Sequence, residues 1–283
     1  MLVVSTKQAV RARRQELWRQ GLRVAFVPTM GALHEGHLAL VRRGRELADE
    51  VWVSIFVNPT QFGPGEDFDR YPRNLERDTA LLEQEGVHLL FAPEVREMYP
   101  RPPQVVLELP ELGAHLCGAH RPGHFRGVAL VVAKLFNIVQ PEVALFGAKD
   151  FQQALLVQRM VEDLDFPVHI EVVPTVREED GLAMSSRNSY LAPEERRAAL
   201  AFSRALREAA GAVARGERQG RALEELMLAC LREQPAVRPQ YVAAVDPATL
   251  EPVERIQERV LLAVAGFVGS TRLIDNLLVE VKG

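Results

Sequence analysis

The chain has 283 residues, of which 47% are hydrophobic and 25% are charged, and its formal net charge is −4. This composition is that of an ordinary globular protein, and the length is enough for one large domain or, as we expect, two. The small negative charge excludes a molecule-wide field that would attract nucleic acid or an anionic membrane, so any anion site must be local.

The N-terminal residues predict a helix over 5–20 whose N-cap is Ser5 or Thr6. The side chains expected to face a core are Val10, Leu17 and Trp18. The basic run 11–14 is interpreted as a solvated helix face rather than a transit peptide. Charge arrives too early for a signal peptide, and no apolar run approaches the roughly 18 residues of a membrane span.

Residues 24–27 are apolar and predict a buried strand. Pro28 is expected to end the strand pairing, and Gly31 and Gly36 are expected to adopt backbone conformations that other residues avoid. A helix follows from Gly36 to about Leu47. A strand, a glycine-bearing turn and a helix N-terminus form an anion site, because unpaired N–H groups and the helix dipole point into the turn. We expect a triphosphate to bind here.

Strands and helices continue to alternate up to about residue 175. The predicted strands are 51–57, 87–92, 143–146 and 168–173, and the predicted helices are 74–85, 128–138 and 151–163. Segment 93–127 is rich in Pro, Gly and His and is interpreted as an insertion or a lid-like segment. The alternation predicts an α/β fold, with a Rossmann-like doubly wound parallel sheet in a domain of residues 1–175.

A change in composition near residue 176 predicts a smaller α+β domain over residues 176–283. Two amphipathic helices are expected over 193–232 with a break around 216–220. The strands expected after them are 241–245, 260–265 and 273–279. Two distant cysteines, Cys117 and Cys230, lack metal-ligand spacing and are interpreted as reduced thiols of a cytoplasmic protein.

His34 and His37 stand three residues apart at the predicted helix start, so their imidazoles fall on the same side of its first turn. Ring N–H groups there can bond phosphate oxygens and stabilise charge that grows on phosphorus. The competing interpretation is two ordinary helix-start histidines, one capping and one exposed. The pattern is not His-Glu-x-x-His, so a zinc protease is not indicated.

Two other strand ends carry candidate side chains. Gln61 follows the strand 51–57, where open α/β sheets place ligands, although a loop amide in water explains it equally well. Lys149 follows the strand 143–146 and is one of few lysines among 34 basic residues, which favours a phosphate-binding role. Asp150 is a candidate ribose ligand or a plain helix cap, and Gln153 lies one turn later.

Two loops offer further donors. Ser185, Ser186 and Arg187 follow a turn signal near the domain boundary, which favours a mobile loop over phosphates, and an ordinary surface turn is about as consistent. Arg121, His124 and Arg126 form a basic loop that either binds a carboxylate or is only solvated.

Four motifs in chain order closely resemble the pantothenate synthetase (pantoate–β-alanine ligase) family of the His-x-Gly-His nucleotidyltransferase superfamily. They are Pro28 to His37, Asn58 to Phe62, Phe146 to Asp150, and Met184 to Asn188. The resemblance covers essentially the whole chain. It implies that the pantoate carboxylate attacks the α-phosphorus of ATP, giving pantoyl adenylate and pyrophosphate. The amine of β-alanine then attacks the adenylate, and AMP leaves.

The resemblance also implies roles for individual residues. His37, His34 and Lys149 are implied to be catalytic, and Asp78 to help hold a Mg²⁺ cofactor. Gln61 and Gln153 are implied to bind pantoate, with Gln61 also contacting β-alanine. The residues implied to bind ATP are Met30, Gly31, Ala32, Leu33, His34, Glu35, Gly36, His37, Gly147, Ala148, Lys149, Asp150, Val176, Met184, Ser185, Ser186 and Arg187. The expected partners are these small molecules and a second copy in a homodimer through the N-terminal domain, with no nucleic acid and no membrane.

Three alternatives share part of this pattern. An adenylyltransferase of the same superfamily would need no amine site, and the segment Asn58 to Phe62 is not expected in it. A class I aminoacyl-tRNA synthetase would normally carry Lys-Met-Ser-Lys-Ser and a basic surface, whereas this chain has Ala-Met-Ser-Ser-Arg and a net charge of −4. A non-catalytic nucleotide sensor would not need the full set of phosphate ligands.

Overall fold

The computed structural model describes residues 1–281 and divides into two compact units. The first unit comprises Met1–Gly113, Arg121–Ala148 and Gln153–Pro174, and the second comprises Ala114–His120, Lys149–Gln152 and the chain from Thr175 onward. Two short segments from the first 175 residues therefore pack with the second unit. Within residues 1–281, none of the helices combines the length and the hydropathy needed to cross a membrane.

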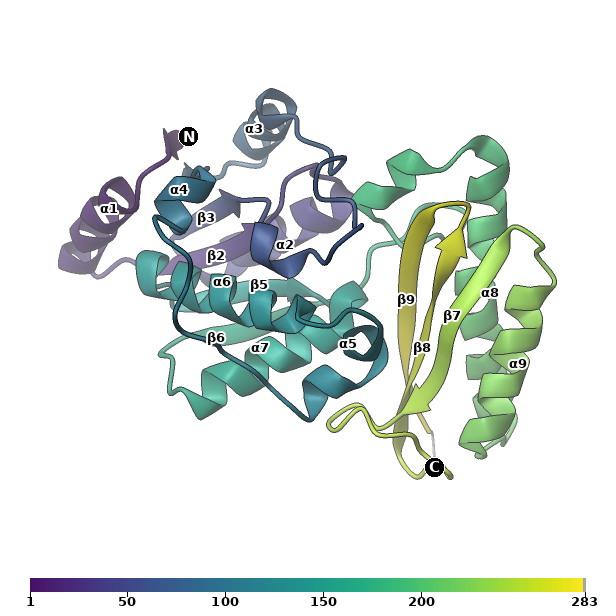
Figure 1. Ribbon diagram of the computed structural model, residues 1–283. Coiled ribbons are helices and arrows are strands. Elements are labelled where there is room, and N and C mark those ends of the chain that lie inside the picture. Colours follow the sequence, from purple (N-terminus) through teal and green to yellow (C-terminus); the bar gives the residue numbers. More distant parts are fainter. Residues whose placement is uncertain (282–283) are drawn as a thin grey trace. The chain divides into compact units, whose positions relative to one another are not determined.

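The first unit is built on a six-stranded sheet in the order β1-β4-β3-β2-β5-β6, in which every adjacent pair is parallel (Figure 1). Its strands are β1 (Leu2–Val4), β2 (Val24–Thr29), β3 (Glu50–Ile55), β4 (Leu89–Phe91), β5 (Val143–Gly147) and β6 (His169–Val173). Its helices are α1 (Lys7–Gln20), α2 (Glu35–Leu47), α3 (Leu75–Gln84), α4 (Val95–Met98), α6 (His124–Val139) and most of α7 (Phe151–Asp163). The predicted Rossmann-like doubly wound sheet is confirmed.

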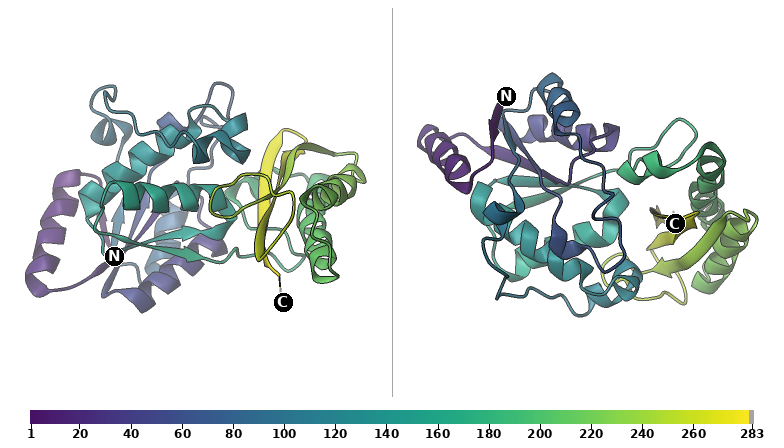
Figure 2. Two further views of the ribbon diagram at one scale, coloured as in Figure 1. Left: turned by 90° about the horizontal axis from the view of Figure 1, so that it is seen from below. Right: turned by 45° about the horizontal axis from the view of Figure 1, so that its top comes forward.

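Helices cover both faces of this sheet (Figure 2), because successive strand residues point in opposite directions and both sets are apolar. Leu145 of β5 packs in one buried cluster with Val41 of α2. Its neighbour Phe146 contacts Phe136 of α6 on the other face, with ring centroids 6.5 Å apart. Near-continuous apolar strands such as 51–57 are therefore a reliable signal of a sheet buried on both sides.

Pro28 does not end the strand, contrary to the prediction. β2 pairs with β3 from Val24 to Thr29, and the carbonyl of Thr29 accepts a hydrogen bond from Phe56 on that side. Backbone polar groups alternate between the two sides of a strand, so the Pro28 nitrogen faces the β5 side. There β2 pairs only at Ala25 and Phe26, so the missing N–H breaks no ladder hydrogen bond.

The first helix, α1, begins after its N-cap Thr6 as predicted, but two of its side chains are placed differently. Trp18 is 49% exposed instead of facing a core. Arg14, from the run expected to be solvated, is 1% exposed and donates to the carbonyls of Gln140 and Leu22. Its guanidinium also lies over the Trp18 ring, 4.7 Å from the centroid. A single sequence cannot reveal a distant acceptor such as the Gln140 carbonyl.

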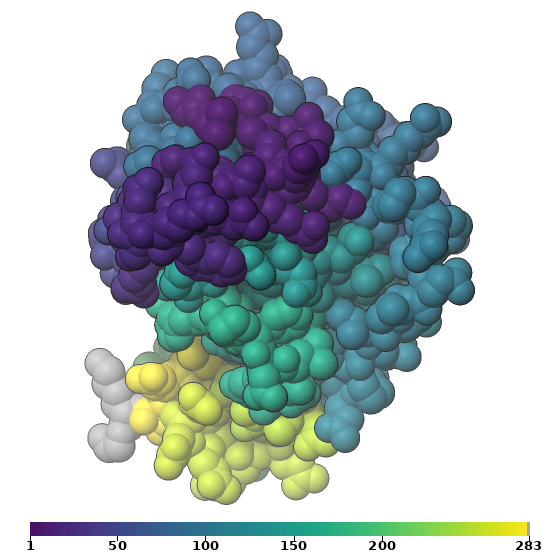
Figure 3. Space-filling model, turned by 90° about the vertical axis from the view of Figure 1, so that its left-hand side faces the viewer, coloured from purple at the N-terminus to yellow at the C-terminus, as the bar shows by residue number. Residues whose placement is uncertain are grey.

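The N-terminal segment forms part of the surface of the first unit (Figure 3, purple). β1 is one of the two edge strands of the sheet and was not expected from the sequence, because it is only three residues long. Leu2 and Val3 are each 48% exposed on it. These apolar side chains and an edge with no partner strand within residues 1–281 are typical features of an interaction surface.

The second unit is an antiparallel sheet in the order β7-β8-β9 with helices packed on it (Figure 1). Its longer elements are α8 (Pro193–Ala214), α9 (Gly220–Arg232), β7 (Val237–Val245), β8 (Arg259–Val268) and β9 (Thr271–Glu280). Apolar residues of both helices share one buried core with β8, for example Phe202, Leu223 and Leu262. The predicted small α+β architecture is confirmed. The short helix α5 (Leu116–His120) belongs to this unit as well.

Candidate active site

The loop between β2 and α2 positions the two predicted histidines. His34 is the N-cap of α2, and its Nδ1 accepts a hydrogen bond of 3.2 Å from the backbone N–H of Gly36. The backbone N–H of His34 donates in turn to Nδ1 of His37 over 3.4 Å. The two rings lie 4.1 Å apart between centroids. The expectation that both imidazoles share one side of the first turn is met, and the capping role considered as an alternative applies to His34.

These contacts determine which ring nitrogen can donate. A ring nitrogen that accepts a hydrogen bond carries no proton, so the neutral imidazoles of His34 and His37 hold their protons on Nε2. Each ring thus supplies an N–H donor at the N-terminus of α2. Two such donors, together with the helix dipole, favour a phosphate group at this position.

The carboxylate of Asp78, in α3, is hydrogen-bonded to the backbone of the same loop. It is 1% exposed, and its two carboxylate oxygens accept from the backbone N–H groups of Ala32 at 2.7 Å and Leu33 at 2.9 Å. Both oxygens are thus engaged by the loop, which does not fit the metal-ligand role expected for Asp78. Among residues 1–281, no group of three or more His, Cys, Asp or Glu side chains could hold a metal ion.

The glycines of this loop behave differently from each other. Gly31 has φ +80°, the left-handed conformation predicted for it, and a Cβ there would stand 3.0 Å from both Asp78 Oδ2 and a methyl group of Ile55. Gly36 does not adopt a positive φ, contrary to the prediction, because it lies inside the first turn of α2. The sharp turn therefore depends on Gly31 and on the non-glycine Ala32, which has φ 51°.

Gln61 is held by a buried network instead of lying in water. It is 8% exposed, and its Oε1 accepts from Asn58 Nδ2 at 3.0 Å. Its Nε2 then faces Met30 Sδ at 3.1 Å, which brings the residues predicted for pantoate and for ATP into contact. The hydroxyl of Tyr99 donates to Asn58 Oδ1 at 3.0 Å. Tyr99 was missed by sequence reasoning, because it belongs to no motif and lies in the irregular segment 93–127.

The basic loop contacts the backbone of Gln61. Arg121 makes a two-pronged ion pair with Glu66, at 2.7 and 2.6 Å, and also contacts His124 Nε2 at 3.0 Å. The other ring nitrogen of His124 lies 2.8 Å from the Gln61 carbonyl oxygen. Burial alone would raise the pKa of the Glu66 carboxyl, but the hydrogen bonds and charge of Arg121 and the N–H of Gly63 lower it overall. The charge of Arg121 is thus largely balanced by Glu66.

Lys149 and Asp150 lie in the short helix η3 (Ala148–Asp150), directly after Gly147 at the end of β5. The Lys149 carbonyl accepts from Asn276 Nδ2 at 2.8 Å, and Asp150 is exposed. The two glutamines that follow, Gln152 and Gln153, differ in their burial and in their contacts. Gln152 is buried and its Oε1 accepts from the N–H of Cys117 at 2.9 Å, whereas the predicted pantoate ligand Gln153 is half-buried and belongs to the first unit.

The predicted phosphate loop Met184–Arg187 is anchored on both sides. The N–H of Met184 donates to the Val176 carbonyl at 3.0 Å, and the next residue, Arg177, forms a two-pronged ion pair with the buried Asp275 at 2.7 and 3.0 Å. On the other side, Ser185 caps the short helix η4 (Ser186–Tyr190) by accepting from the N–H of Arg187 at 3.2 Å. The structure thus presents a well-held turn of hydroxyl and guanidinium groups.

Each unit therefore assembles its own group of candidate residues. The first unit brings together His34 and His37 on one loop, and Met30 with Gln61. In the second, Asn276 links the two candidate segments, since it donates to Lys149 and its carbonyl accepts from Arg177, the neighbour of Val176, at 3.4 Å.

Comparison with known sequences identifies the same family that the four motifs resemble. A family model described as pantoate-beta-alanine ligase matches residues 2–278. A pantothenate synthetase from Moorella thermoacetica is 54% identical over 282 residues, which is 100% of both chains. One from Thermoanaerobacter sp. (strain X514) is 53% identical over 278 residues, which is 98% of both chains.

Solved structures agree with the sequence matches. Pantothenate synthetase from Thermus thermophilus has a TM-score of 0.93 at 51% identity, covering 98% of this chain and 99% of that one. A pantoate-beta-alanine ligase from Francisella tularensis, complexed with beta-gamma ATP and beta-alanine, has a TM-score of 0.81 at 33% identity, covering 98% and 97%. On the family match, the sequence identity and the shared fold, the chain belongs to the pantoate–β-alanine ligase family.

Proposed function

We propose that this chain condenses pantoate with β-alanine to form pantothenate, through a pantoyl adenylate made from ATP. The observation that carries the proposal is the pair of imidazoles at the start of α2, whose Nδ1 atoms both accept backbone N–H groups and whose ring centroids lie 4.1 Å apart. Membership of the ligase family and the motif order support the choice of substrates.

In the first step, a carboxylate oxygen of pantoate attacks the α-phosphorus of ATP, and the bond to the pyrophosphate oxygen breaks. His34 and His37 donate to oxygens of the α- and β-phosphates, where negative charge increases in the transition state. The ammonium of Lys149, the hydroxyls of Ser185 and Ser186 and the guanidinium of Arg187 balance the remaining triphosphate charge.

In the second step, the neutral amine of β-alanine attacks the acyl carbon, and AMP leaves with the carboxylate oxygen it received from pantoate. The ammonium proton of β-alanine is released to solvent before the attack, and the second proton that the nitrogen loses as the amide forms is released when AMP leaves. Gln61 holds pantoate and meets β-alanine with its carboxamide, whose orientation Asn58 determines by donating to Oε1. Gln153 holds pantoate from the start of α7, and Asp150 and the backbone at Gly147 and Val176 hold the nucleoside.

The domain roles and the metal are part of the proposal. Residues 1–175 are proposed to bind the nucleotide and pantoate, and residues 176–283 to act as the smaller lid domain. We propose that Mg²⁺ binds together with the ATP phosphates, since an ion that is held by phosphate oxygens and water needs few protein ligands. Because Asp78 is engaged by backbone N–H groups, we assign the metal no step of its own.

We also propose a cellular compartment and an oligomeric state for the enzyme. Two buried free thiols, Cys117 and Cys230, fit a reducing compartment such as the cytoplasm. The exposed Leu2 and Val3 on the edge strand β1 support a homodimer through the N-terminal domain. Light scattering on the purified chain tests the dimer, and replacement of both residues by Ser is expected to yield monomers.

The test of the reaction uses pantoate with ¹⁸O in its carboxylate, together with ATP, Mg²⁺ and β-alanine. The products expected are pantothenate and AMP that carries one ¹⁸O atom. Omission of β-alanine is expected to allow release of pyrophosphate for about one turnover and no steady release of AMP, because the AMP group then stays in the pantoyl adenylate. Steady AMP release without β-alanine, or AMP without ¹⁸O, would contradict the proposal.

A further inference from the structure

Two adjacent residues of β9, Asp275 and Asn276, hold the two candidate ATP segments of the second unit. Asp275 forms a two-pronged ion pair with Arg177, which follows Val176 in the chain. The side-chain amide of Asn276 donates to the carbonyl of Lys149 at 2.8 Å. Arg177, Asp275 and Asn276 lie outside the four motifs and have no role in the reaction proposed above.

The two β9 residues lie on opposite faces of the sheet, because successive side chains of a strand point in opposite directions. Leu273 and Leu277 pack on the core that α8 and α9 share with β8. Asp275 alternates with them on this helix-covered face and is 3% exposed. Asn276 therefore lies on the other face, where it contacts Lys149. β9 thus carries one anchor on each face.

The ion pair with Asp275 is the charged anchor. The two nitrogens of the Arg177 fork lie 2.7 and 3.0 Å from the two carboxylate oxygens. The same guanidinium donates to the Asn276 carbonyl at 3.4 Å. Arg177 also forms an antiparallel bridge with Ala183, so residues 176–184 form a hairpin. The predicted phosphate loop directly follows this hairpin and is thereby tied to β9.

The amide of Asn276 is the neutral anchor, and it holds the backbone from which the Lys149 side chain extends. The strand that carries both anchors is regular, because β9 pairs with β8 at every residue from Thr271 to Glu280 without a shift in register. Consecutive Cα atoms of a chain are about 3.8 Å apart. Covalent geometry and sheet pairing therefore fix the separation of the two anchors, which a pair of loops alone would leave variable.

We propose that Asn276 and the Arg177–Asp275 pair are positioning residues for the adenylation step. They hold the Lys149 ammonium and the donors of Ser185–Arg187 at a fixed separation that suits the triphosphate. The inference rests on the proposed function and extends it to residues outside the motifs. A misplacement of about 1 Å at a reacting centre can lower a rate about 10²-fold, so such anchors matter for catalysis. Asn276 contacts the backbone of Lys149, so its effect on the reaction passes through Lys149.

The first test is Asn276→Ala, which removes the amide donor. The measurement is the burst of pyrophosphate release with Mg²⁺ and with ATP and pantoate in excess, without β-alanine. We expect the burst rate at saturating ATP to fall by about tenfold or more. The ATP concentration for half-maximal rate is expected to change less than about threefold, because the anchor serves mainly the transition state. A purely structural role would lower stability and leave the rate per folded molecule unchanged.

Asn137→Ala is the matched control, because the side-chain amide of Asn137 also donates to a backbone carbonyl, that of Ala133, at 2.9 Å. Asn137 lies in α6 of the first unit and belongs to no candidate segment. It is expected to keep the wild-type burst rate. A wild-type rate in Asn276→Ala, or an equal loss in the control, would overturn the proposal.

A double-mutant cycle tests whether Asn276 acts through Lys149. In the background of Lys149→Ala, the further change Asn276→Ala is expected to alter the burst rate less than about twofold, because the ammonium that it positions is already absent. A structural defect would lower the rate by the same factor in both backgrounds. That result would refute positioning through Lys149.

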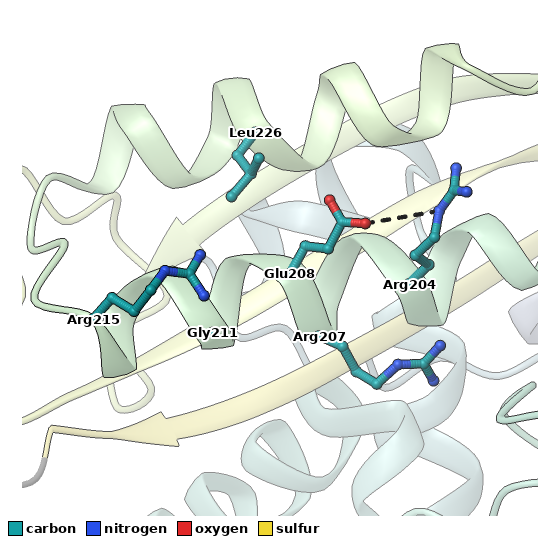
Figure 4. A pocket seen from close by; sticks show the side chains of 6 residues that line it. All are labelled: Arg204, Arg207, Glu208, Gly211, Arg215 and Leu226. Carbon is teal, nitrogen blue, oxygen red and sulfur yellow. Dashed lines mark ion pairs between the residues drawn. The ribbon is translucent and has the colours of Figure 1, made fainter.

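Arg177→Lys tests the charged anchor. The ammonium keeps the charge beside Asp275 but cannot form the fork, so the burst rate is expected to fall at least about fivefold. Arg204→Lys is the matched control, because Arg204 of α8 is paired with Glu208 in the same unit (Figure 4) and belongs to neither candidate segment. Circular dichroism checks that both variants are folded at the assay temperature. No loss in Arg177→Lys, or an equal loss in the control, would rule out this role of Arg177.

A crystal structure of Asn276→Ala without ligands separates this inference from the ligase proposal. The Lys149 carbonyl is expected to move by about 1 Å relative to β9, as compared with a crystal structure of the wild type. A carbonyl that keeps its wild-type position would overturn the inference even in an active enzyme. A wild type that releases no pyrophosphate from ATP and pantoate would overturn the ligase proposal, and the displacement of Lys149 would still show whether Asn276 is its anchor.

Discussion

Nδ1 of His37 accepts the backbone N–H of His34, so each histidine of the pair helps to hold the other at the start of α2. The ring of His37 therefore has two separable tasks. Its Nδ1 completes the cap of the helix, and its Nε2–H is the group proposed to donate to a phosphate oxygen. Substitutions that mimic one nitrogen at a time can distinguish the two tasks.

His37→Asn places an amide oxygen near the Nδ1 position and removes the Nε2 donor. We expect nearly unchanged stability and a loss in kcat on the order of 10²–10³, the usual effect of removing one transition-state donor. His37→Ala removes the cap as well and is expected to cost about 1 kcal/mol of stability in addition. AMP formation and urea unfolding measure the two effects, with the exposed His169→Asn as control. Near-wild-type turnover in His37→Asn would remove this residue from the mechanism.

Asp78→Asn tests whether this side chain positions the loop or holds a metal. One of the two backbone N–H groups then faces an NH2 group and loses its acceptor, the other keeps only a neutral acceptor, and a destabilisation of about 2–3 kcal/mol is expected. The Mg²⁺ concentration for half-maximal activity is expected to stay the same. A large shift in that concentration without loss of stability would instead support a metal ligand. Asp163→Asn, at the exposed end of α7, is the control.

Gly31→Ala should be worse than Gly21→Ala although both glycines have positive φ, +80° and +68°. A left-handed alanine costs roughly 1–2 kcal/mol at either position. At Gly21 nothing lies within 4 Å of the new methyl group, whereas at Gly31 it meets the buried Asp78 at 3.0 Å. The difference in unfolding free energy between the two variants measures that contact. Equal values would show that the loop relaxes without cost.

Tyr99→Phe removes the hydroxyl that donates to Asn58 and leaves the ring beside Phe56 in place. Since Asn58 orients Gln61, we expect the KM for pantoate to rise about fivefold, which corresponds to roughly 1 kcal/mol for one neutral hydrogen bond. The KM for ATP is expected to stay the same. A parallel rise in both constants would indicate a general disturbance of the loop and not a positioning role for Tyr99.

Glu66→Gln is expected to destabilise the protein at pH 7 by about 1–2 kcal/mol, because the ion pair with Arg121 is lost. The folded-state pKa of Glu66 lies below its ordinary value of 4.5. Its contribution is therefore complete above pH 4.5 and is lost as the pH falls through the folded pKa. Urea unfolding from pH 7 to about pH 3 should show the curves of wild type and variant converging at low pH. A constant gap between them would contradict this assignment.

The pattern of apolar residues alone determined the architecture. Strands such as 51–57 and 143–146 have no polar face, and only a sheet covered on both sides buries them. The turn with Gly31 and a helix predicted from Gly36, one residue after the observed start of α2 at Glu35, followed from local chemistry, since capping and left-handed backbone depend on a few neighbouring residues. The motifs alone also identified the family, before any geometry was known.

Only the tertiary structure decided the long-range partners. Asp78 reaches back to the N–H groups of Ala32 and Leu33, and Tyr99 reaches Asn58 from an irregular segment. Arg14 is buried, and one of its acceptors, the Gln140 carbonyl, lies more than a hundred residues away, so its position in a basic run was misleading. Sequence spacing predicts contacts within a turn of helix or along a strand, because those distances are set by the backbone itself. Contacts between elements depend on how the elements pack, and no local pattern of this chain contains that information.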